Sequence, residues 1–463
     1  MKIINFGSLN IDKVYDLDEF ARAGQTVFAK NYEIFAGGKG LNQSVAAARA
    51  GGAVIHAGQI GEDGLFLKDL LSEADADTSF IRTIDEPTGH AVIEVDKAGQ
   101  NRIIVFGGAN QKLTEDYIDL VLEQAKEGDI ILLQNETNLI GEIIKKAADV
   151  KARIAFNPSP FPESANDLPL NLVNIFLVNE IEAAQLAEIK DETSNEEILN
   201  KIIEKYPEAA VVMTIGDKGV LYGYKDERLE QQSFTVPVAD TTAAGDTFTG
   251  YFLSAICRGK DISTALELSC AASAIAVSKK GAAPSIPKLS DVFAFLLEER
   301  FEFRNIKATE AIQAAKIEAV CFPPNEACPK SAMIERALKI PELFLVAVDK
   351  KTGKIAGFLN GIATDKETFA DEFFTDTSLY EPDSKNVMLL GLDVLPEYRN
   401  QGLASEIMHR YALREAEKGR ECLILTCLDE KIPMYKKMGF KDLGLSASVW
   451  GGEKWHDMEM RLG

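Results

Sequence analysis

The stretch that decides the fold is Asp240-Thr241-Thr242-Ala243-Ala244-Gly245-Asp246-Thr247-Phe248-Thr249-Gly250. Its three small residues, 243–245, lead directly into a segment with apolar residues at helical spacing: Phe248, Tyr251, Phe252, Ala255 and Ile256. A turn of small residues at the start of a helix leaves backbone N–H groups free, and together with the helix dipole they bind anions. The stretch therefore predicts a phosphate-binding turn followed by a helix.

Asp246 is an unexpected residue in such a turn, because its negative charge repels phosphate. A carboxylate at this place is suited to take a proton from a hydroxyl group that attacks the phosphate. An ordinary aspartate cap at the start of a helix is an equally good explanation of the spacing alone. The pattern GxxxxGK[ST] is absent from the sequence, so the chain is not expected to be a P-loop enzyme.

The surrounding sequence predicts an α/β fold. Short apolar runs at residues 3–6, 103–106, 130–133, 154–156, 175–178 and 211–215 alternate with helical stretches such as 44–50, 117–126 and 196–205. This alternation indicates a mostly parallel sheet covered on both faces by helices. Two other segments, near residues 13–35 and 89–105, alternate polar and apolar residues like half-exposed strands and predict a small separate sheet.

A second glycine-rich stretch is Gly37-Gly38-Lys39-Gly40-Leu41-Asn42-Gln43-Ser44, which precedes a helical segment. Glycines allow the backbone to approach a ligand closely, and Lys39 and Asn42 can form hydrogen bonds with hydroxyl groups. A tight turn before a helix would explain the cluster equally well.

Together the two stretches resemble the ribokinase branch of the PfkB sugar-kinase family, and the likeness extends over residues 1 to about 298. Further segments match in order: residues 7–12, 132–136, 179–182, 214–219 and 279–285. Many PfkB kinases have glycine at the position of Ala243, whereas ribokinases often have alanine. The resemblance implies a three-layer α/β/α sandwich with a small β-sheet lid as a first domain, residues 1–299.

The resemblance also implies the roles of single residues. Asp246 would be the base that deprotonates the 5-hydroxyl of the sugar, with Ala243, Ala244 and Gly245 forming an anion hole. The sugar would be held by Asn10, Asp12, Gly38, Lys39, Gly40, Asn42 and Glu136. The ATP and Mg²⁺ side would contain Asn179, Glu182, Thr214 and Gly216. A potassium ion would be bound near Asp240, Thr242, Ala276, Lys279, Gly281 and Ser285. We expect D-ribose as the substrate and a homodimer formed through the lid; another sugar or a nucleoside remains open.

A second domain is expected over residues 300–463, because residues 301–306 alternate like a new strand after an apolar helical segment. A predicted strand at 387–394 is followed by Arg399-x-x-Gly402-x-Ala404 and a helix extending to about residue 418. Small residues in a turn between a strand and a helix suit a pyrophosphate. A capped amphipathic helix without a ligand is the alternative.

The order of this strand, this turn, a further strand at 422–427 and Tyr435-x-x-x-Gly439-Phe440 resembles the GNAT acetyltransferases, which have an α/β fold. Residues 322–329 and 446–451 resemble the arylalkylamine N-acetyltransferases more closely. By this resemblance acetyl-CoA would be bound by Leu392, Val394, Arg399, Asn400, Gln401, Gly402, Leu403 and Ala404. Tyr435 would protonate the leaving thiolate, and Glu326 is the candidate base for the amine. A GNAT module that binds acetyl-CoA only to regulate the kinase is the alternative.

The composition limits the partners. The formal net charge of −22 disfavours binding to nucleic acid. The sequence contains no apolar run of membrane-spanning length and no signal peptide at its start, and its six cysteines show no zinc-binding spacing. We therefore expect a cytoplasmic enzyme that acts on small molecules.

Overall fold

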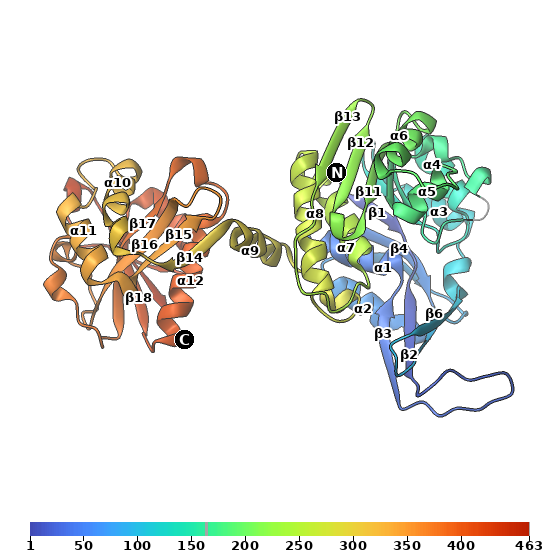
Figure 1. The fold of residues 1–463 in the computed structure, drawn as a ribbon, viewed down its shortest axis with the longest axis horizontal. Helices are drawn as coiled ribbons and strands as arrows, with labels where there is room; N and C mark the ends of the chain where they lie inside the picture. Colours follow the sequence, from blue (N-terminus) through green and yellow to red (C-terminus); the bar gives the residue numbers. More distant parts are fainter. Residues whose placement is uncertain (163–164, 463) are drawn as a thin grey trace. The chain divides into compact units, whose positions relative to one another are not determined.

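The computed structural model describes residues 1–162 and 165–462, and it divides into two compact units, Met1–Val292 and Phe293–Gly463 (Figure 1). The division falls within α9 (Leu289–Arg300). The sequence pattern predicted the domain boundary a few residues later, after residue 299. Each unit has its own hydrophobic core. In the residues described, no helix is long and apolar enough to cross a membrane.

The first unit is built on a nine-stranded sheet. Its strands are parallel except for β12 and β13, which form an antiparallel edge. In spatial order they are β13 (Glu227–Gln231), β12 (Val220–Tyr224), β11 (Ala210–Thr214), β10 (Ile175–Asn179), β9 (Arg153–Asn157), β8 (Ile130–Gln134), β1 (Ile3–Phe6), β4 (Val54–Ile60) and β5 (Asp77–Thr83). The central strands are buried on both sides, as expected when helices cover both faces.

Helices cover both faces of this sheet, which gives the predicted three-layer sandwich (Figure 1). On one face lie α3 (Glu115–Leu122), α4 (Ile140–Asp149), α5 (Glu180–Leu186) and α6 (Asn195–Lys205). On the other lie α1 (Lys39–Arg49), α2 (Leu65–Glu73), α7 (Ala244–Cys257) and α8 (Ile262–Val277). Helix α7 is buried from Asp246 to Cys257, because α1 and α8 pack along it.

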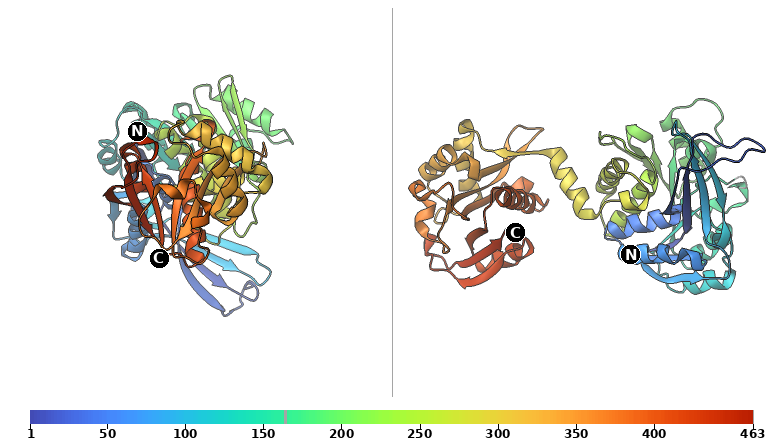
Figure 2. Two further views of the ribbon diagram at one scale, coloured as in Figure 1. Left: turned by 90° about the vertical axis from the view of Figure 1, so that its left-hand side faces the viewer. Right: turned by 90° about the horizontal axis from the view of Figure 1, so that it is seen from below.

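The small separate sheet is present and has four strands in the order β3 (Asn31–Gly37), β2 (Asn10–Asp16), β6 (Gly89–Val95) and β7 (Asn101–Phe106). Figures 1 and 2 show this sheet, with β2 and β3 in blue and β6 in teal, projecting from the rest of the unit. Residues 103–106 form part of the edge strand β7 of the small sheet, as the half-exposed pattern near 89–105 predicted; counting them among the apolar runs of the main sheet was wrong. All residues of β7 are exposed, so an apolar run alone does not reveal which sheet a strand joins.

The second unit is a seven-stranded sheet with helices on both faces. The strand order is β14 (Phe301–Asn305), β15 (Phe344–Asp349), β16 (Ile355–Thr364), β17 (Asn386–Val394), β18 (Cys422–Cys427), β20 (His456–Arg461) and β19 (Lys441–Leu445). One core contains α10 (Ala311–Cys321) and α11 (Lys330–Lys339). The other contains α12 (Leu403–Glu417) and borders α13 (Ile432–Lys437).

The sheet opens between β17 and β18. These two parallel strands pair only where Asn386–Met388 meets Cys422–Ile424. Next to this point β17 has a bulge, because Asn360 of β16 faces Gly391 whereas Gly361 faces Leu389. The later part of β17 therefore has no strand partner on the β18 side, and its backbone groups remain available to a ligand.

Candidate active sites

The predicted phosphate turn lies at the start of α7. Ala243 precedes the helix with a φ of 63°, in the left-handed region that favours glycine. The alanine is tolerated at a cost of about 1 kcal/mol. The Ala244 N–H lies 3.3 Å from the carbonyl oxygen of Thr241, and a Cβ atom on Gly245 would meet no atom within 4 Å. The turn therefore has open space beside Gly245 for an anion.

Asp246 lies in the first turn of α7 and is 7% exposed. One of its carboxylate oxygens accepts a hydrogen bond from Asn42 Nδ2 (3.1 Å), and the other accepts one from Gln43 Nε2 (2.9 Å). Both donors come from α1, which packs against α7. The two amide groups fix the orientation of the carboxylate without neutralising it, as a proton acceptor requires.

Lys39 and Glu136 lie next to this carboxylate. Glu136 Oε2 accepts hydrogen bonds from the Ser8 hydroxyl and from the backbone N–H of Lys39 (3.0 Å). The charge of Asp246 raises the pKa of Lys39 above its usual value, although burial opposes the rise. Burial raises the pKa of Glu136. Lys39 is therefore a firmly held cation between two carboxylates.

Asn10 and Asp12 come from the start of β2, next to the glycine turn. Asn10 Oδ1 accepts a hydrogen bond from Asn110 Nδ2 (2.8 Å). Burial, with a smaller contribution from the charge of Glu136, raises the pKa of Asp12 to about 6. A Cβ atom on Gly37 would lie 2.1 Å from Asp12 Oδ2, so glycine is needed there to leave room for this carboxyl group.

A cavity of about 410 Å³ joins the turn to the ends of the central strands. The predicted residues that line it are Lys39, Asn179, Glu182, Thr214, Gly216, Ala243, Ala244, Gly245 and Asp246. The other predicted sugar contacts, Asn10, Asp12, Gly38, Gly40, Asn42 and Glu136, lie beside this cavity rather than in its wall. They connect to it through the contacts of Asp246 and Lys39 described above.

Asn179 and Glu182 make a reciprocal cap at the start of α5. Asn179 Oδ1 accepts from the Glu182 N–H (2.9 Å), and Glu182 Oε2 accepts from the Asn179 N–H (3.1 Å). This capping box is a sufficient structural reason for the two side chains. Their position in the cavity wall leaves a role toward a nucleotide possible as well.

The predicted potassium residues come from two segments that Asp240 joins. Asp240 Oδ1 accepts from the Thr242 backbone and hydroxyl (2.9 and 2.6 Å), and Oδ2 accepts from the Gly281 N–H (3.0 Å). Burial alone would raise the pKa of Asp240, but these hydrogen bonds hold this pKa below its usual value. The other residues lie around the C-terminal end of α8: the Ala276 carbonyl accepts from the Lys279 N–H (3.1 Å), and Ser285 Oγ donates to the Ala282 carbonyl (2.8 Å).

The second unit contains a cavity of about 680 Å³ where β17 and β18 separate. Among the predicted acetyl-CoA residues, the wall includes Leu392, Val394, Arg399, Asn400, Gly402, Leu403 and Ala404. The Arg399 Nε–H donates to the Val394 carbonyl (2.8 Å). Gln401 is not part of the wall, because its side chain binds Arg300 (2.7 Å) and the Glu397 carbonyl (3.0 Å).

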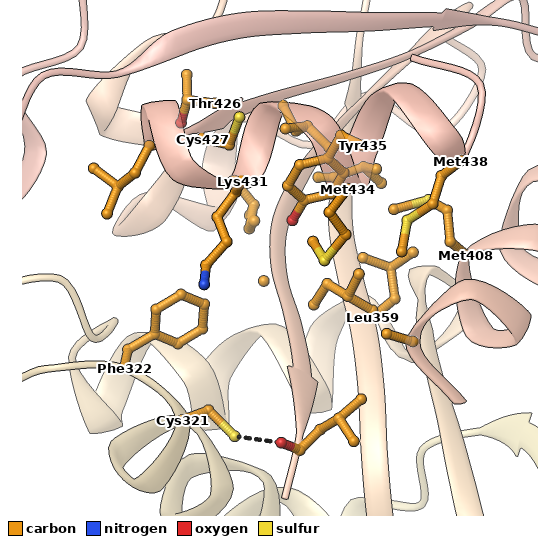
Figure 3. A pocket seen from close by; sticks show the side chains of 18 of the residues that line it. Cys321, Phe322, Leu359, Met408, Thr426, Cys427, Lys431, Met434, Tyr435 and Met438 are labelled. Carbon is orange, nitrogen blue, oxygen red and sulfur yellow. Dashed lines mark hydrogen bonds between the residues drawn. The ribbon is translucent and has the colours of Figure 1, made fainter. Parts of the chain in front are cut away.

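Tyr435 enters this cavity from α13 (Figure 3). In Figure 3, Lys431 and Tyr435 face Cys321 and Phe322, which come from the end of α10 on the opposite side. Burial, followed by the charges of Cys427 and Asp393, raises the pKa of the Tyr435 phenol above its usual value. A neutral phenol in a cavity is the form that can donate a proton.

Glu326 also lines the cavity, at its edge. Its backbone carbonyl accepts a hydrogen bond from Trp450 Nε1 (2.7 Å), and the neighbouring Asn325 side chain donates to the Gly451 carbonyl (3.0 Å). These contacts bring together residues 322–329 and 446–451, which are distant in the sequence. Burial and the nearby Glu453 and Glu430 raise the pKa of Glu326.

Several functional neighbours were not predicted from the sequence. Gln43, Ser8 and Asn110 hold the three predicted residues Asp246, Glu136 and Asn10 in place. Gln43 lies within the quoted glycine stretch, but nothing in that stretch shows that its side chain reaches α7. In the second unit, Glu318 of α10 lines the cavity and carries no motif that would have identified it.

Each of the two units matches a known protein family. A model of the pfkB family of carbohydrate kinases matches residues 1–289, and a model of the GNAT acetyltransferase domain matches residues 341–442. Ribokinase from Haemophilus influenzae is 38% identical over 299 residues, which are 63% of this chain and 96% of that protein.

Two solved structures match the first unit. Ribokinase from Thermotoga maritima is 34% identical and aligns with a TM-score of 0.58 over 64% of this chain and 99% of that one. Arabidopsis thaliana ribokinase, solved with ribose and ATP, is 29% identical and has a TM-score of 0.58 over 64% of this chain and 98% of that one. The ribokinase-like fold followed by a separate GNAT domain is thereby confirmed.

Proposed function

The chain belongs to the pfkB family of carbohydrate kinases, and we propose that its first unit transfers the terminal phosphoryl group of ATP to the 5-hydroxyl of D-ribose. The observation that carries this proposal is the buried Asp246 carboxylate beside the phosphate turn, held by Asn42 and Gln43. Ribose is proposed as the substrate because relatives of 33–38% identity are named ribokinases.

In this mechanism Asp246 accepts the proton of the sugar hydroxyl as its oxygen attacks the terminal phosphorus. The new P–O bond forms while the bond from phosphorus to the departing ADP oxygen breaks and its electron pair remains on ADP. Backbone N–H groups of residues 243–246 donate to the phosphoryl oxygens, whose negative charge they stabilise. Lys39, beside Asp246, adds a positive charge near the transferred group.

The sugar would lie between β2 and the glycine turn, where Asp12, Asn10 and Glu136 can accept or donate hydrogen bonds to hydroxyl groups. This assignment rests on the resemblance together with the closeness of Asp12 and Glu136, whose charges interact. It explains why Gly37 must lack a side chain.

Two ions are proposed for the kinase. Among the described residues, no group of three or more His, Cys, Asp or Glu side chains could hold a metal. Mg²⁺ would bind mainly to phosphate oxygens and water, with Glu182 as one carboxylate of the cavity wall, and would neutralise phosphate charge. Potassium would bind where Asp240 joins Thr242 to Gly281, with Ala276, Lys279 and Ser285 nearby.

The kinase proposal is tested by measuring ADP release with D-ribose and a panel of sugars and nucleosides, with and without potassium. We expect turnover with ribose and stimulation by potassium. The rate of Asp246→Asn should be about 10²–10⁴-fold lower than that of the natural chain. Turnover with another sugar and none with ribose would leave the role of Asp246 intact and replace the substrate.

For the second unit we propose acetyl-CoA-dependent N-acetylation of an amine. The observation that carries it is the cavity between β17 and β18, which brings Tyr435 together with the Arg399–Ala404 turn. The unpaired backbone of β17 would bind the pantetheine amides, and the turn would bind the pyrophosphate. An arylalkylamine is one candidate acceptor, on the resemblance of residues 322–329 and 446–451 alone.

In the acetyl transfer, one C–N bond forms and one C–S bond breaks. The lone pair of the neutral amine forms a bond to the acetyl carbonyl carbon, and the C–S bond breaks with its electron pair on sulfur. Tyr435 donates its phenolic proton to the sulfur, and the proton lost by the nitrogen leaves through a base, for which Glu326 is the first candidate. Tyr435 is then protonated again from solvent.

This proposal is tested by measuring release of the CoA thiol from acetyl-CoA with an amine panel, comparing the natural chain with Tyr435→Phe. An acetyltransferase loses most of its turnover in the variant while still binding acetyl-CoA. A regulatory module would bind acetyl-CoA in both proteins, show no thiol release, and change the kinase rate instead.

A homodimer through the four-stranded sheet is also proposed. The sheet carries exposed apolar side chains on its outer strand β7, including Ile104 (65% exposed) and Val105 (65%). Such a patch on a soluble protein indicates a contact surface. Sedimentation should give twice the chain mass for the natural protein and the monomer mass for Ile104→Asp.

A further inference from the structure

A pair of buried carboxyl groups lies against the cavity of the second unit, and the proposed mechanism does not use it. Glu318 of α10 is 3% exposed and lines the cavity, and Asp393 of β17 is 0% exposed. They are on neighbouring elements, since α10 packs against β17. Buried carboxyl groups are rare unless they are paired with a cation, a donor or a ligand.

The two carboxyl groups have few partners outside the pair. Glu318 Oε1 accepts from the Cys328 N–H (2.8 Å), whereas the buried Glu318 Oε2 and both oxygens of Asp393 interact by hydrogen bonding, among the residues described, only with each other and with the Cys321 thiol. Arg336 is the nearest buried cation, yet its guanidinium donates to Asn360, to Cys328 Sγ (2.9 Å) and to the Phe374 carbonyl (2.9 Å). Structural ion pairing with Arg336 therefore does not explain the pair.

The oxygens of the pair face the wall of the cavity at Gly391. A Cβ atom on Gly391 would lie 3.0 Å from Asp393 Oδ2 and 3.3 Å from Glu318 Oε2, and Gly391 itself lines the cavity. The bulge in β17 lies next to this glycine, so the strand is locally irregular at this point. The absence of a side chain at 391 thus leaves Glu318 in the cavity wall uncovered, with the fully buried Asp393 behind it.

The two carboxyl groups interact directly with each other. Burial and then the charge of Glu318 raise the pKa of Asp393 well above its usual value, and the hydrogen bond between the two groups raises it further. Burial raises the pKa of Glu318, while the Cys328 N–H, Arg336 and Asp393 partly oppose the rise. Arg336, Cys321, Cys328 and Tyr435 also interact electrostatically with Asp393.

We propose that Glu318 receives the ammonium group of a primary aliphatic amine and accepts its proton before acetyl transfer, with Asp393 as a positioning residue beneath it. In this step one N–H bond breaks and one O–H bond forms on Glu318, and the freed lone pair of nitrogen becomes the nucleophile. The proposal rests on the proposed acetyl transfer for its consequence. It places the proton acceptor at Glu318, which is 3% exposed, rather than at the half-buried Glu326 of the same cavity wall.

The first test measures binding without turnover, by calorimetry of a primary alkylamine added to the full chain loaded with CoA. The variant Glu318→Gln retains a carbonyl oxygen for the Cys328 N–H and so preserves the fold. We expect it to weaken amine binding about tenfold or more, as loss of a charged hydrogen bond does. The matched control Glu421→Gln, an exposed carboxylate outside the cavity that pairs with Lys385 (2.6 Å), should bind like the natural chain.

The second test is the pH profile of kcat/KM for the amine. Glu318→Gln should lose about 10²-fold or more. The hydrogen bond from Asp393 lowers the pKa of Glu318. Asp393→Leu removes this donor, so the acidic limb should move to higher pH, whereas Asp393→Asn still donates and should keep the limb of the natural chain.

Equal amine binding in the natural chain and Glu318→Gln, or an acidic limb unmoved by Asp393→Leu, would overturn the inference. Amine binding that depends on Glu318 in a chain without acetyl transfer would support it and refute the proposed transferase activity instead.

Discussion

At the scale of single residues, the first site depends on a carboxylate placed where an anion must also bind. Asp246 is buried, and both of its oxygens are held by neutral amides from α1. Neutral donors orient the carboxylate and leave its charge, whereas a salt bridge would lower its basicity. The charge of Asp246 raises the pKa of Lys39, although no hydrogen bond joins the two side chains among the residues described.

Asp12 gives a prediction about pH. Its pKa is raised to about 6, first by burial and then by Glu136, so the carboxylate that accepts sugar hydroxyls is lost as the pH falls through that value. The KM for ribose should therefore rise about tenfold between about pH 7 and about pH 5. Steady-state kinetics of the natural chain and Asp12→Asn would check this.

Asp12→Asn is the control for this prediction. The pKa of Glu136 is also raised, so the titration of Glu136 must be distinguished from that of Asp12. Asp12→Asn should bind ribose more weakly at every pH, with a flatter dependence. A KM that rises equally steeply in both proteins would assign the titration to another group.

At the scale of elements, the sequence was informative wherever local chemistry decides the structure. The turn at 243–245, the strand at 387–394 and the helix after Gly402 all form where their patterns predicted them. The partners of the site residues could not be predicted, because Gln43 and Asp246 are 203 positions apart and meet only through the packing of α1 on α7. Residues 103–106 fitted two predictions, because an apolar run alone does not show that β7 pairs with the adjacent β6 of the small sheet.

The contact of α1 with α7 gives a second prediction. A Cβ atom on Gly250 would lie 2.5 Å from Ala46 Cβ and 2.6 Å from the Gln43 carbonyl oxygen. Gly250→Ala should lower the free energy of unfolding by about 1–3 kcal/mol. It should also reduce kinase turnover, because the displaced α1 carries Asn42 and Gln43. Denaturant titration and ADP release would measure the two effects.

Gly141→Ala is the matched control within α4. Its Cβ atom would lie 3.4 Å from Leu168 Cδ2, an ordinary contact, so the change should be neutral or gain up to about 1 kcal/mol. Equal stability of the two variants would show that α1 and α7 do not pack as closely as described.

At the scale of the whole molecule, the chain has two units with separate cores and separate cavities. A ligand that binds only the folded form stabilises that form by about 2.7 kcal/mol at a hundred times its Kd. In scanning calorimetry we expect acetyl-CoA to raise the Tm of one transition, and ATP with ribose to raise the Tm of another. A single transition that both ligands shift equally would indicate one cooperative body.

The most direct test of the account measures ADP release with ribose and CoA release with an amine in the same preparations of the natural chain, Asp246→Asn and Tyr435→Phe. We predict that Asp246→Asn loses ADP release and keeps CoA release, and that Tyr435→Phe shows the reverse. Loss of both activities in either variant, or the absence of either activity in the natural chain, would contradict two independent active sites in one chain.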